Sequence, residues 1–307
     1  MKVSVLINSR NRLQPLIRCL KSVFNQNYSN YEIVVLDDAS DSINLCQALL
    51  GVFKCPFLRC FRSDTQLGVA GSRNLLMRLA TGEVFCFIDD DAYFESPDAL
   101  TRFVKVFSIH KNIGIVACKV INHCGNNTDL LVPFSRRWRR HKPNSVEEGQ
   151  FVSYYLGTCH SIRREVFEHC GPYEDDMMFG GEELDLSYRA INAGYYIYYE
   201  PSIVVHHYPQ TSVVGPGDQK EKNAKELYYS LRNRYYLAYR YLPLQYMPSY
   251  LVVWTGYYFW KALRLGHLSA FLRGLRDGIW EFRKNPRNPL NNQAQSYLKK
   301  HYGRLWY

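Results

Sequence analysis

The chain lacks the glycine-rich loop that two common classes of nucleotide-binding α/β enzyme place after their first strand. Residues 2–8 are predicted to form that strand, and residues 8–12 (Asn-Ser-Arg-Asn-Arg), which follow its apolar core, contain no glycine. A dinucleotide oxidoreductase needs Gly-x-Gly-x-x-Gly here, so that the backbone can approach the pyrophosphate. A sugar nucleotidyltransferase also needs a glycine-rich loop at this point. Both classes are therefore excluded.

Zinc-type cysteine spacing, a signal peptide and a nucleic-acid recognition motif are also missing. The nine cysteines are dispersed, and the nearest pair, Cys55 and Cys60, has no partner Cys or His at zinc-finger intervals. An odd, dispersed set fits a reducing compartment. Because the chain runs straight into a predicted strand, we expect a protein that faces the cytosol. Without a recognition motif, we expect no nucleic-acid partner.

Acidic residues are scarce at the C-terminal end. From Lys261 onward ten residues are basic and two are acidic, so this segment carries +8 of the net charge of +10. The preceding stretch, Tyr241–Trp260, is uncharged and long enough to span a bilayer, but its two prolines, one glycine and five tyrosines favour an interfacial segment. The basic segment is predicted to form an amphipathic helix on an anionic membrane surface. Packing on the rest of the chain and dimerisation are the alternatives.

The first half of the chain alternates strand and helix patterns, which predicts an α/β fold. Apolar runs predict the strands, and apolar residues at helical spacing predict the helices. The predicted strands are 2–8, 31–36, 57–61 and 83–88, and the predicted helices begin near Leu13, Val69 and Ser96. This order favours a mostly parallel sheet with helices on both faces. Further strands are predicted at 113–121, 151–156, 195–199 and 203–207.

Carboxylates follow two of the predicted strands. Asp37 and Asp38 end the second strand, and Asp89, Asp90 and Asp91 end the fourth. Ligands of such sheets bind at the carboxyl ends of the strands, so these acids are expected to meet in one crevice. Three adjacent carboxylates repel one another, and Mg²⁺ or Mn²⁺ shared with a substrate diphosphate would compensate the charge. A solvated turn is the alternative.

Residues 180–189 (Gly-Gly-Glu-Glu-Leu-Asp-Leu-Ser-Tyr-Arg) form the second polar cluster. The glycines predict a loop that enters a helix, whose dipole favours Glu182 and Glu183 in its first turn. Asp185 and Arg189 are four residues apart, which predicts a structural ion pair. Downstream, His206 and His207 end a predicted strand, where either histidine could complete a metal site.

Five motifs together resemble the family 2 inverting glycosyltransferases of the GT-A fold, including bacterial polysaccharide and rhamnosyltransferase-like enzymes. They span about the first 210 residues in the order that the family has. The motifs are Val3–Ile7 with Asn11-Arg12, Glu32–Ser40, Gly68–Asn74, Phe87–Asp91 and Gly181–Arg189.

The resemblance implies a role for each matching residue. Asp38 would bind the nucleobase, Arg73 would help to hold the nucleotide, and Asn8 and Arg10 would lie beside the donor. Asp91 and Asp89 would bind the metal, His206 or His207 would lie beside it, and Asp90 would contact the ribose or sugar. Glu183 would be the catalytic base, with Glu182 and Asp185 in support. Two residues depart from the family pattern: Glu183, where Asp is usual, and Arg10, where an aromatic residue is common.

These expectations combine into a GT-A domain over residues 1–210 and a helical, aromatic and basic extension over 211–307. Residues 1–112 would bind the nucleotide sugar and 113–210 the acceptor. The predicted function is metal-assisted, inverting transfer of a sugar to a glycan acceptor, which we expect to be lipid-linked and reached at the cytosolic membrane face. The alternatives are a protein- or small-molecule-directed transferase whose extension makes a homodimer, and a non-catalytic nucleotide-sugar-binding module.

Overall fold

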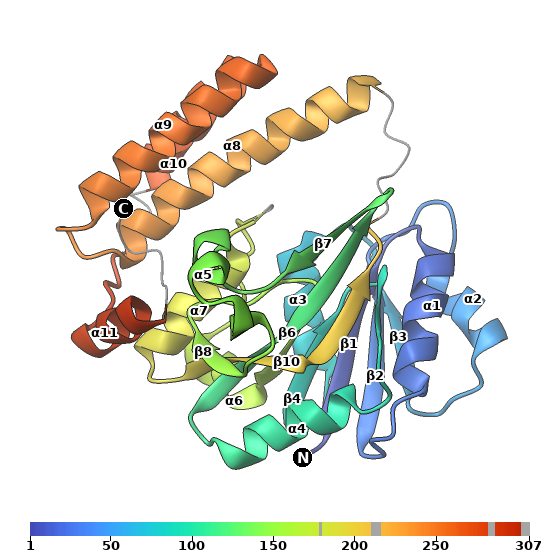
Figure 1. The fold of residues 1–307 in the computed structure, drawn as a ribbon. Helices are drawn as coiled ribbons and strands as arrows, with labels where there is room; N and C mark the ends of the chain where they lie inside the picture. The colour runs from blue at the N-terminus through green and yellow to red at the C-terminus, as the bar shows by residue number, and fades with distance from the viewer. Residues whose placement is uncertain (178–179, 210–215, 282–285, 302–307) are drawn as a thin grey trace.

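A mixed sheet of ten strands forms the centre of the computed structural model (Figure 1), which describes residues 1–177, 180–209, 216–281 and 286–301. Eight strands follow one another in the order β3-β2-β1-β4-β9-β6-β10-β5, while β7 pairs with β6 and β8 pairs with β10. The strands are β1 (Val3–Ser9), β2 (Tyr31–Asp37), β3 (Leu58–Arg62), β4 (Val84–Ile88), β5 (Ala92–Phe94), β6 (Ile113–Cys124), β7 (Asn127–Leu131), β8 (Gln150–Val152), β9 (Cys159–Arg163) and β10 (Tyr196–His207).

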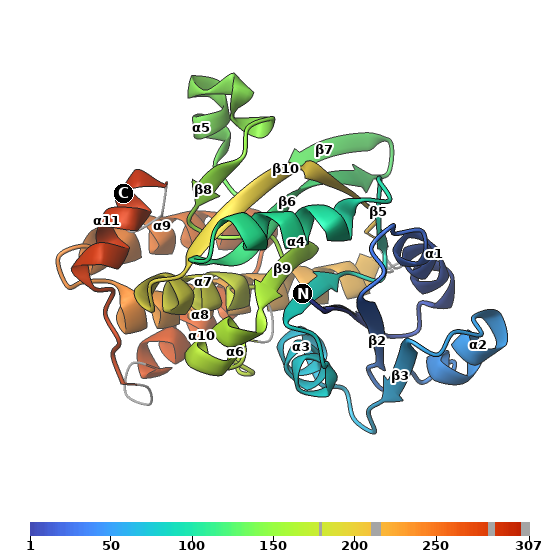
Figure 2. The same cartoon turned by 90° about the horizontal axis from the view of Figure 1, so that it is seen from below.

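Helices cover both faces of this sheet (Figure 2). The helices are α1 (Leu13–Phe24), α2 (Leu45–Val52), α3 (Gly68–Leu79), α4 (Ala99–Ile109), α5 (Arg136–His141), the 3₁₀ helix η1 (Pro143–Val146), α6 (Arg164–Cys170), α7 (Glu182–Asn192), α8 (Pro216–Tyr241), α9 (Met247–Leu265), α10 (Leu268–Glu281) and α11 (Asn292–Lys300). Alternate strand residues point to opposite faces. Accordingly, Val3, Val5 and Ile7 of β1 join the core beneath α1 and α4, whereas Leu6 joins the core beneath α3 and α7.

The parallel half of the sheet confirms the pattern of the first 90 residues. Strands β3, β2, β1 and β4 are all parallel, and β1, β2 and β4 are mostly apolar because helices bury both sides of them, whereas β3 is a half-exposed edge strand. Three elements of the second half differ from the prediction. Strand β9, which has no predicted counterpart, lies antiparallel between β4 and β6. The two strands predicted over 195–207 are one strand, β10, with an irregularity between Glu200 and Val204. Strand β8 ends at Val152, so residues 153–156 form a loop.

Helices α8, α9 and α10 form a layer beside α7, as Figure 1 shows. Helix α10 lies close to α8 because Gly274 and Gly278 face it; a Cβ at Gly278 would lie 2.8 Å from the Cβ of Tyr235. Helix α11 returns to the sheet, where the Tyr297 hydroxyl donates to the Val152 carbonyl at 2.9 Å. The extension therefore packs on the first domain. The predicted boundary after residue 210 lies outside the described residues and stays a prediction.

The structure bears on two expectations, one about membrane-spanning helices and one about the cysteines. No helix in the described ranges is long and apolar enough to cross a membrane. The cysteines are not all free, because Cys46 at the start of α2 forms a disulfide with Cys60 of β3, and the other seven are free thiols. The dispersed spacing, which fitted a reducing compartment, gave no sign of this pair, because the fold and not the sequence spacing brings α2 against β3.

Candidate active site

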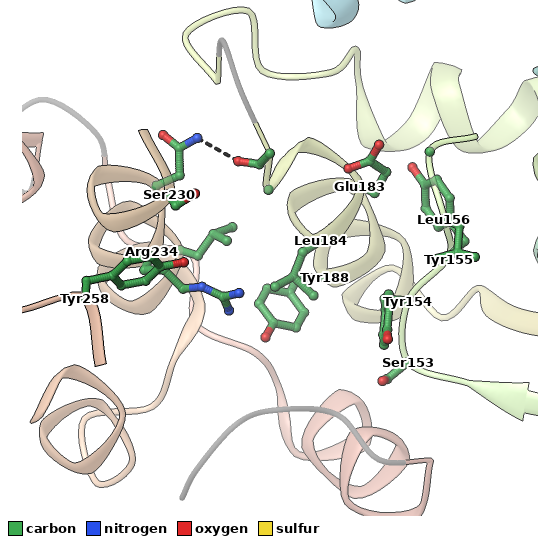
Figure 3. Close-up of a pocket in the computed structure, with 15 residues that line it drawn as sticks. Ser153, Tyr154, Tyr155, Leu156, Glu183, Leu184, Tyr188, Ser230, Arg234 and Tyr258 are labelled. Atoms are coloured by element: carbon green, nitrogen blue, oxygen red, sulfur yellow. Dashed lines mark hydrogen bonds between the residues drawn. The ribbon is translucent and has the colours of Figure 1, made fainter. Parts of the chain in front are cut away.

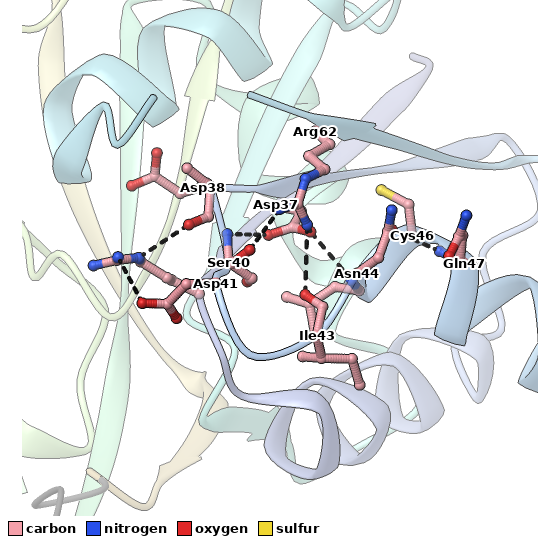
Figure 4. Close-up of polar contacts among 12 residues, drawn as sticks. Asp37, Asp38, Ser40, Asp41, Ile43, Asn44, Cys46, Gln47 and Arg62 are labelled. Atoms are coloured by element: carbon pink, nitrogen blue, oxygen red, sulfur yellow. Dashed lines mark hydrogen bonds and ion pairs between the residues drawn. The ribbon is translucent and has the colours of Figure 1, made fainter. Parts of the chain in front are cut away.

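The carboxyl ends of β1, β2 and β4 bring the first group of predicted residues together. Asp37 is fully buried and structural: it accepts hydrogen bonds from the Ser40 and Leu45 amides at 2.9 and 3.1 Å and pairs with Arg62 at 2.7 Å (Figure 4). Next to it, Asp38 accepts from the Leu67 and Gly68 amides at 2.6 and 3.1 Å. Asp38 therefore fixes the start of α3, and its role toward a nucleobase stays a prediction.

Arg10 lies at the edge of the same crevice. Its guanidinium donates to the Ala39 carbonyl at 3.3 Å and to Gln66 Oε1 at 2.9 Å, and it lies 3.6 Å from Asp41. Half-buried Asn8 occupies the end of β1, opposite Leu36 of β2. Both residues thus lie beside Asp38, where the resemblance places the donor.

The three acids at the end of β4 differ in their contacts. The buried Asp90 carboxylate accepts from the Ser9 hydroxyl at 2.5 Å and pairs with Arg12 at 2.9 Å. The residue predicted to contact a ribose or sugar is thus turned toward Ser9 of β1 and toward Arg12. Asp89 and Asp91 instead lie with His207, and one ligand atom from each of the three lies within 4.8 Å of the others.

These three residues fit a divalent metal. Carboxylate oxygens and a neutral imidazole are suitable ligands for Mn²⁺, and carboxylates for Mg²⁺. Burial raises the pKa of Asp89 to about 6 and that of Asp90 to about 7, and the neighbouring Asp91 adds to both shifts. Burial is the largest cause of both shifts, so the ionised carboxylates are poorly solvated even with Arg12 and Arg73 nearby. A bound dication would supply positive charge there.

Of the two histidines predicted to lie beside the metal, the structure places His207, and not His206, with Asp89 and Asp91. His207 Nε2 lies 3.2 Å from Asp91 Oδ1, and its Nδ1 contacts Asn122 Oδ1 at 2.7 Å. His206 points the other way, contacting Glu95 at 2.9 Å and stacking on His123. The reason is geometric, because consecutive residues of a strand point to opposite faces.

Arg12 is a site residue to which no role was assigned from the sequence. Its two terminal nitrogens pair with Asp90 at 2.9 Å and Asp91 at 2.7 Å, so it connects the segment after β1 to the end of β4. The Asn11-Arg12 motif was the available signal. Only the folded arrangement of β1 beside β4 shows which acids it meets.

The predicted base lies at the start of α7. Residue Gly181, with φ of 109°, allows the chain to turn into this helix, which places Glu183 in its first turn. The buried Arg73 of α3 donates to Glu183 Oε1 at 3.0 Å and to the Gly157 carbonyl at 3.0 Å. Gly157 has no side chain where these groups meet, and a Cβ there would overlap Glu183 Oε1. Glu183 is therefore held by a cation and by the shape of the 153–157 loop.

These contacts direct Arg73 toward the predicted base, and its predicted role in holding the nucleotide stays a prediction. Its side chain is 4% exposed, and its guanidinium lies over the rings of Tyr173 and Phe87 at 5.4 and 5.9 Å. Because α3 directs it into the interior, it reaches the base and the Gly157 carbonyl. Arg73 therefore positions Glu183, and no described contact joins it to the crevice beside Asp38.

The two residues predicted to support the base are both buried, and only Glu182 lies next to it. Glu182 is 3.8 Å from Arg73, and burial, with the nearby Glu183, raises the pKa of Glu182 to about 7. Asp185 forms the predicted ion pair with Arg189 at 2.5 Å, which is confirmed, and also accepts from the Tyr241 hydroxyl at 2.5 Å. Asp185 therefore fastens α8 to α7 and takes no direct part in the site.

Glu183 opens into a cavity of about 320 Å³ between α7 and the C-terminal helices (Figure 3). One wall is the 153–157 loop and the start of α7. The other wall comes from α8 and α9, with Ser230, Arg234 and Tyr258. A cavity of this size accommodates a small ligand or one end of a larger one. The C-terminal helices thus complete the site, a contribution that no sequence pattern indicated.

Comparison with solved structures identifies the class of protein. The structure of S. aureus TarS 1-349 with UDP-GlcNAc aligns with 99% of this chain and 87% of its own, with a TM-score of 0.61 and 18% identity. The structure of GalNAc-T7 with UDP, GalNAc and Mn²⁺ aligns with 78% of this chain and 50% of its own, at the same TM-score and 20% identity. The protein has the fold of the GT-A glycosyltransferases.

The sequence then places the chain in a particular family. Residues 4–171 match the profile of "Glycosyl transferase family 2", so the chain belongs to that family and is a glycosyltransferase. It is 35% identical to the putative colanic acid biosynthesis glycosyl transferase WcaA of Escherichia coli (strain K12) over 33% of this chain. It is 28% identical over 30% of this chain to an Escherichia coli protein, UDP-Glc:alpha-D-GlcNAc-diphosphoundecaprenol beta-1,3-glucosyltransferase WfaP. Each match spans only about a third of the relative, 36% of its length.

Proposed function

We propose that this protein transfers a sugar from a nucleotide-diphosphate donor to a glycan hydroxyl, with inversion at the anomeric carbon. One observation carries the proposal. A partly exposed carboxylate, Glu183, faces a cavity, and the cation that holds it, Arg73, also interacts electrostatically with Asp89 of the acid cluster. A base and a diphosphate site are thus connected through one buried side chain.

In this mechanism Glu183 accepts the proton of the acceptor hydroxyl as that oxygen attacks the anomeric carbon. The bond from this carbon to the diphosphate oxygen breaks on the opposite side, so a single displacement inverts the configuration. A positioned general base contributes about 10²–10⁴-fold to such a step. Arg73 and Gly157 keep the carboxylate in place. When bound by Asp89, Asp91 and His207, Mg²⁺ or Mn²⁺ supplies positive charge that offsets the charge developing on the diphosphate.

We infer a lipid-linked glycan as the acceptor. Two observations support it: the name of the relative WfaP, which specifies a diphosphoundecaprenol acceptor, and the distribution of apolar side chains on the C-terminal helices. Of the 18 large apolar side chains that are exposed among the described residues, twelve lie between Leu244 and Trp280. Large exposed apolar patches mark interaction sites.

The exposed apolar residues of α9 and α10 define what we call the outer face: Val252, Val253, Tyr257, Phe259, Trp260, Leu263, Leu265, Leu268, Leu272, Ile279 and Trp280. Cations accompany them, with Arg264, Arg273 and Arg276 exposed and Lys261 half-buried. Apolar residues interleaved with cations suit an anionic bilayer at the cytosolic face, where the apolar groups insert and the cations meet lipid phosphates.

Vesicle flotation of the full chain tests the membrane proposal. We expect flotation with phosphatidylglycerol vesicles and little with phosphatidylcholine vesicles. The double variant Trp260→Ser, Leu263→Ser should lose it, whereas Leu50→Ser, on α2, should not, although Leu50 is 71% exposed. A wild-type protein that fails to float, but forms a dimer broken by the double variant, would instead support the homodimer alternative.

Transfer activity is tested with a panel of UDP-, dTDP- and GDP-sugars in Mg²⁺ or Mn²⁺, monitored by release of the nucleoside diphosphate. Release from at least one donor, enhanced by a glycan acceptor, is expected. Tight donor binding without release under any condition would favour a non-catalytic nucleotide-sugar-binding module. Release enhanced only by a protein or small-molecule acceptor would favour the other alternative.

A further inference from the structure

The cavity that contains Glu183 has a cation on its opposite wall. Arg234 lies on α8, and Figure 3 shows its guanidinium pointing into the cavity toward Tyr188. Glu183 lies on the far side, with Leu184 and Tyr188 between them. The cavity is thus polarised, with a carboxylate at one end and a guanidinium at the other.

Aromatic side chains hold Arg234, and no acidic one does. The guanidinium lies 3.8 Å above the Trp254 ring and donates to the Tyr250 hydroxyl at 3.1 Å. Its strongest electrostatic neighbours are Tyr250 and Tyr258. Among the described residues, no carboxylate forms an ion pair with it. By contrast, Arg73, Arg189 and Arg240 each pair with a carboxylate.

A guanidinium in this setting is suited to an external anion. Burying a cation without a counter-ion costs free energy, and the ring of Trp254 and the hydroxyls of Tyr250 and Tyr258 replace only part of its hydration. A guanidinium has five N–H donors in a planar fork that matches the oxygens of a phosphate. Its hydrogen bonds to the hydroxyls of Tyr250 and Tyr258 leave others for a ligand. The flanking hydroxyls of Ser230 and Tyr258, which also line the cavity, are further donors.

We propose that Arg234 forms a phosphate-binding subsite of the acceptor cavity. A phosphate ester of the acceptor binds the guanidinium, and the glycan attached to it extends toward Glu183, which receives the proton of the reacting hydroxyl. This inference rests on the proposed function, because it assumes that the cavity holds the acceptor. It adds that the acceptor is recognised by its phosphate and from the side of α8 and α9, of which α9 also contributes to the apolar outer face.

Binding is measured without donor or metal, in excess EDTA, so that the acid cluster does not contribute. Three probes are titrated calorimetrically: farnesyl diphosphate, inorganic diphosphate and farnesol. We expect the two phosphates to bind and Arg234→Met to weaken both by about tenfold or more, the effect of losing one charge-assisted interaction. Arg234→Lys should retain part of the affinity. Arg102→Met, which removes a cation of α4 that pairs with Asp98, should not change it.

The pattern among the probes identifies the source of the phosphate. Tighter binding of farnesyl diphosphate than of inorganic diphosphate supports a lipid-linked phosphate, whereas equal binding supports a phosphate recognised without lipid. Binding of farnesol equal to that of farnesyl diphosphate would overturn the proposal, as would phosphate affinity unchanged in a folded Arg234→Met. Donor turnover by the wild-type protein in Mn²⁺ is measured in parallel. If turnover is present and Arg234 has no effect on phosphate binding, only this inference fails.

Discussion

Arg73 Nη1 donates to Glu183 Oε1 at 3.0 Å, and the two residues come from helices 110 positions apart in the chain. The same guanidinium also donates to the Gly157 carbonyl. The orientation of the proposed base therefore depends on α3, on the loop before β9 and on the start of α7 together. Disturbing any of the three should impair turnover before it impairs donor binding.

Arg73→Lys tests this dependence. Lysine keeps the charge, but its ammonium group lacks the planar guanidinium geometry with which Arg73 donates to a carboxylate and a carbonyl at once. We expect kcat to fall about tenfold to a hundredfold, because misplacing a catalytic group by about 1 Å can cost that much, with the KM for donor nearly unchanged. Steady-state kinetics against donor concentration separates the two constants. A large rise in donor KM at constant kcat would show that Arg73 holds the nucleotide after all.

Gly157→Ala tests the third contact. The new Cβ would overlap Glu183 Oε1 and lie 2.9 Å from Arg73 Nη2, so both side chains must move. We expect a loss in kcat of at least about tenfold with donor affinity retained. Gly51→Ala on α2 is the matched control, because its Cβ would meet nothing within 4 Å. Equal kinetics for the two variants would mean that the loop does not constrain the base.

The two adjacent histidines provide a test of the metal site. His207→Ala removes an imidazole that lies with Asp89 and Asp91, whereas His206→Ala removes one that faces Glu95. We expect the Mn²⁺ concentration for half-maximal donor binding to rise about tenfold or more for His207→Ala and to change little for His206→Ala. Fluorescence titration of donor at several Mn²⁺ concentrations measures this. A larger rise for His206→Ala than for His207→Ala would instead assign the metal site to His206.

The raised pKa of Glu182 predicts that the free energy of unfolding depends on pH. Its pKa rises from 4.5 in the unfolded chain to about 7 in the folded protein, chiefly through burial. The folded state therefore binds the proton more tightly, and this group lowers the free energy of unfolding as pH rises from about 4.5 to 7. Glu182→Gln removes this pH dependence. The free energy of unfolding of the variant minus that of wild type should therefore be larger at pH 8 than at pH 5, by on the order of 2 kcal/mol.

Urea unfolding at the two pH values measures the effect, and Glu148→Gln is the control at an exposed position. A Glu182→Gln variant whose stability relative to wild type is the same at pH 5 and pH 8 would contradict the raised pKa.

The order of the motifs was sufficient to predict the parallel half of the sheet and the two acid-bearing regions. Apolar runs such as Val84–Ile88 identify buried strands, and the carboxylates after them lie at the sheet edge by topology alone. Because side chains alternate along β10, counting positions could in principle show which of His206 and His207 faces the acid cluster. The irregularity between Glu200 and Val204 makes such counting unsafe, because it changes the register within the strand.

Long-range contacts explain what the sequence did not predict. Arg73 could be placed on a helix, but its partner depends on how α3 and α7 meet around Gly157. Arg234 lies in a helix with many charged residues, and only the packing of α8 and α9 over α7 makes it part of a cavity. Single-residue patterns describe local structure, whereas these pairs are determined by tertiary packing.

The measurement that tests the account most directly is single-turnover transfer by Glu183→Gln. Glutamine keeps the shape of the side chain but cannot accept the proton, so the rate of transfer should fall about 10²–10⁴-fold while the donor dissociation constant stays within about twofold of wild type. Glu183→Asp, which introduces the residue usual in the family, should retain measurable transfer. Wild-type turnover in Glu183→Gln would contradict the assignment of Glu183 as the catalytic base.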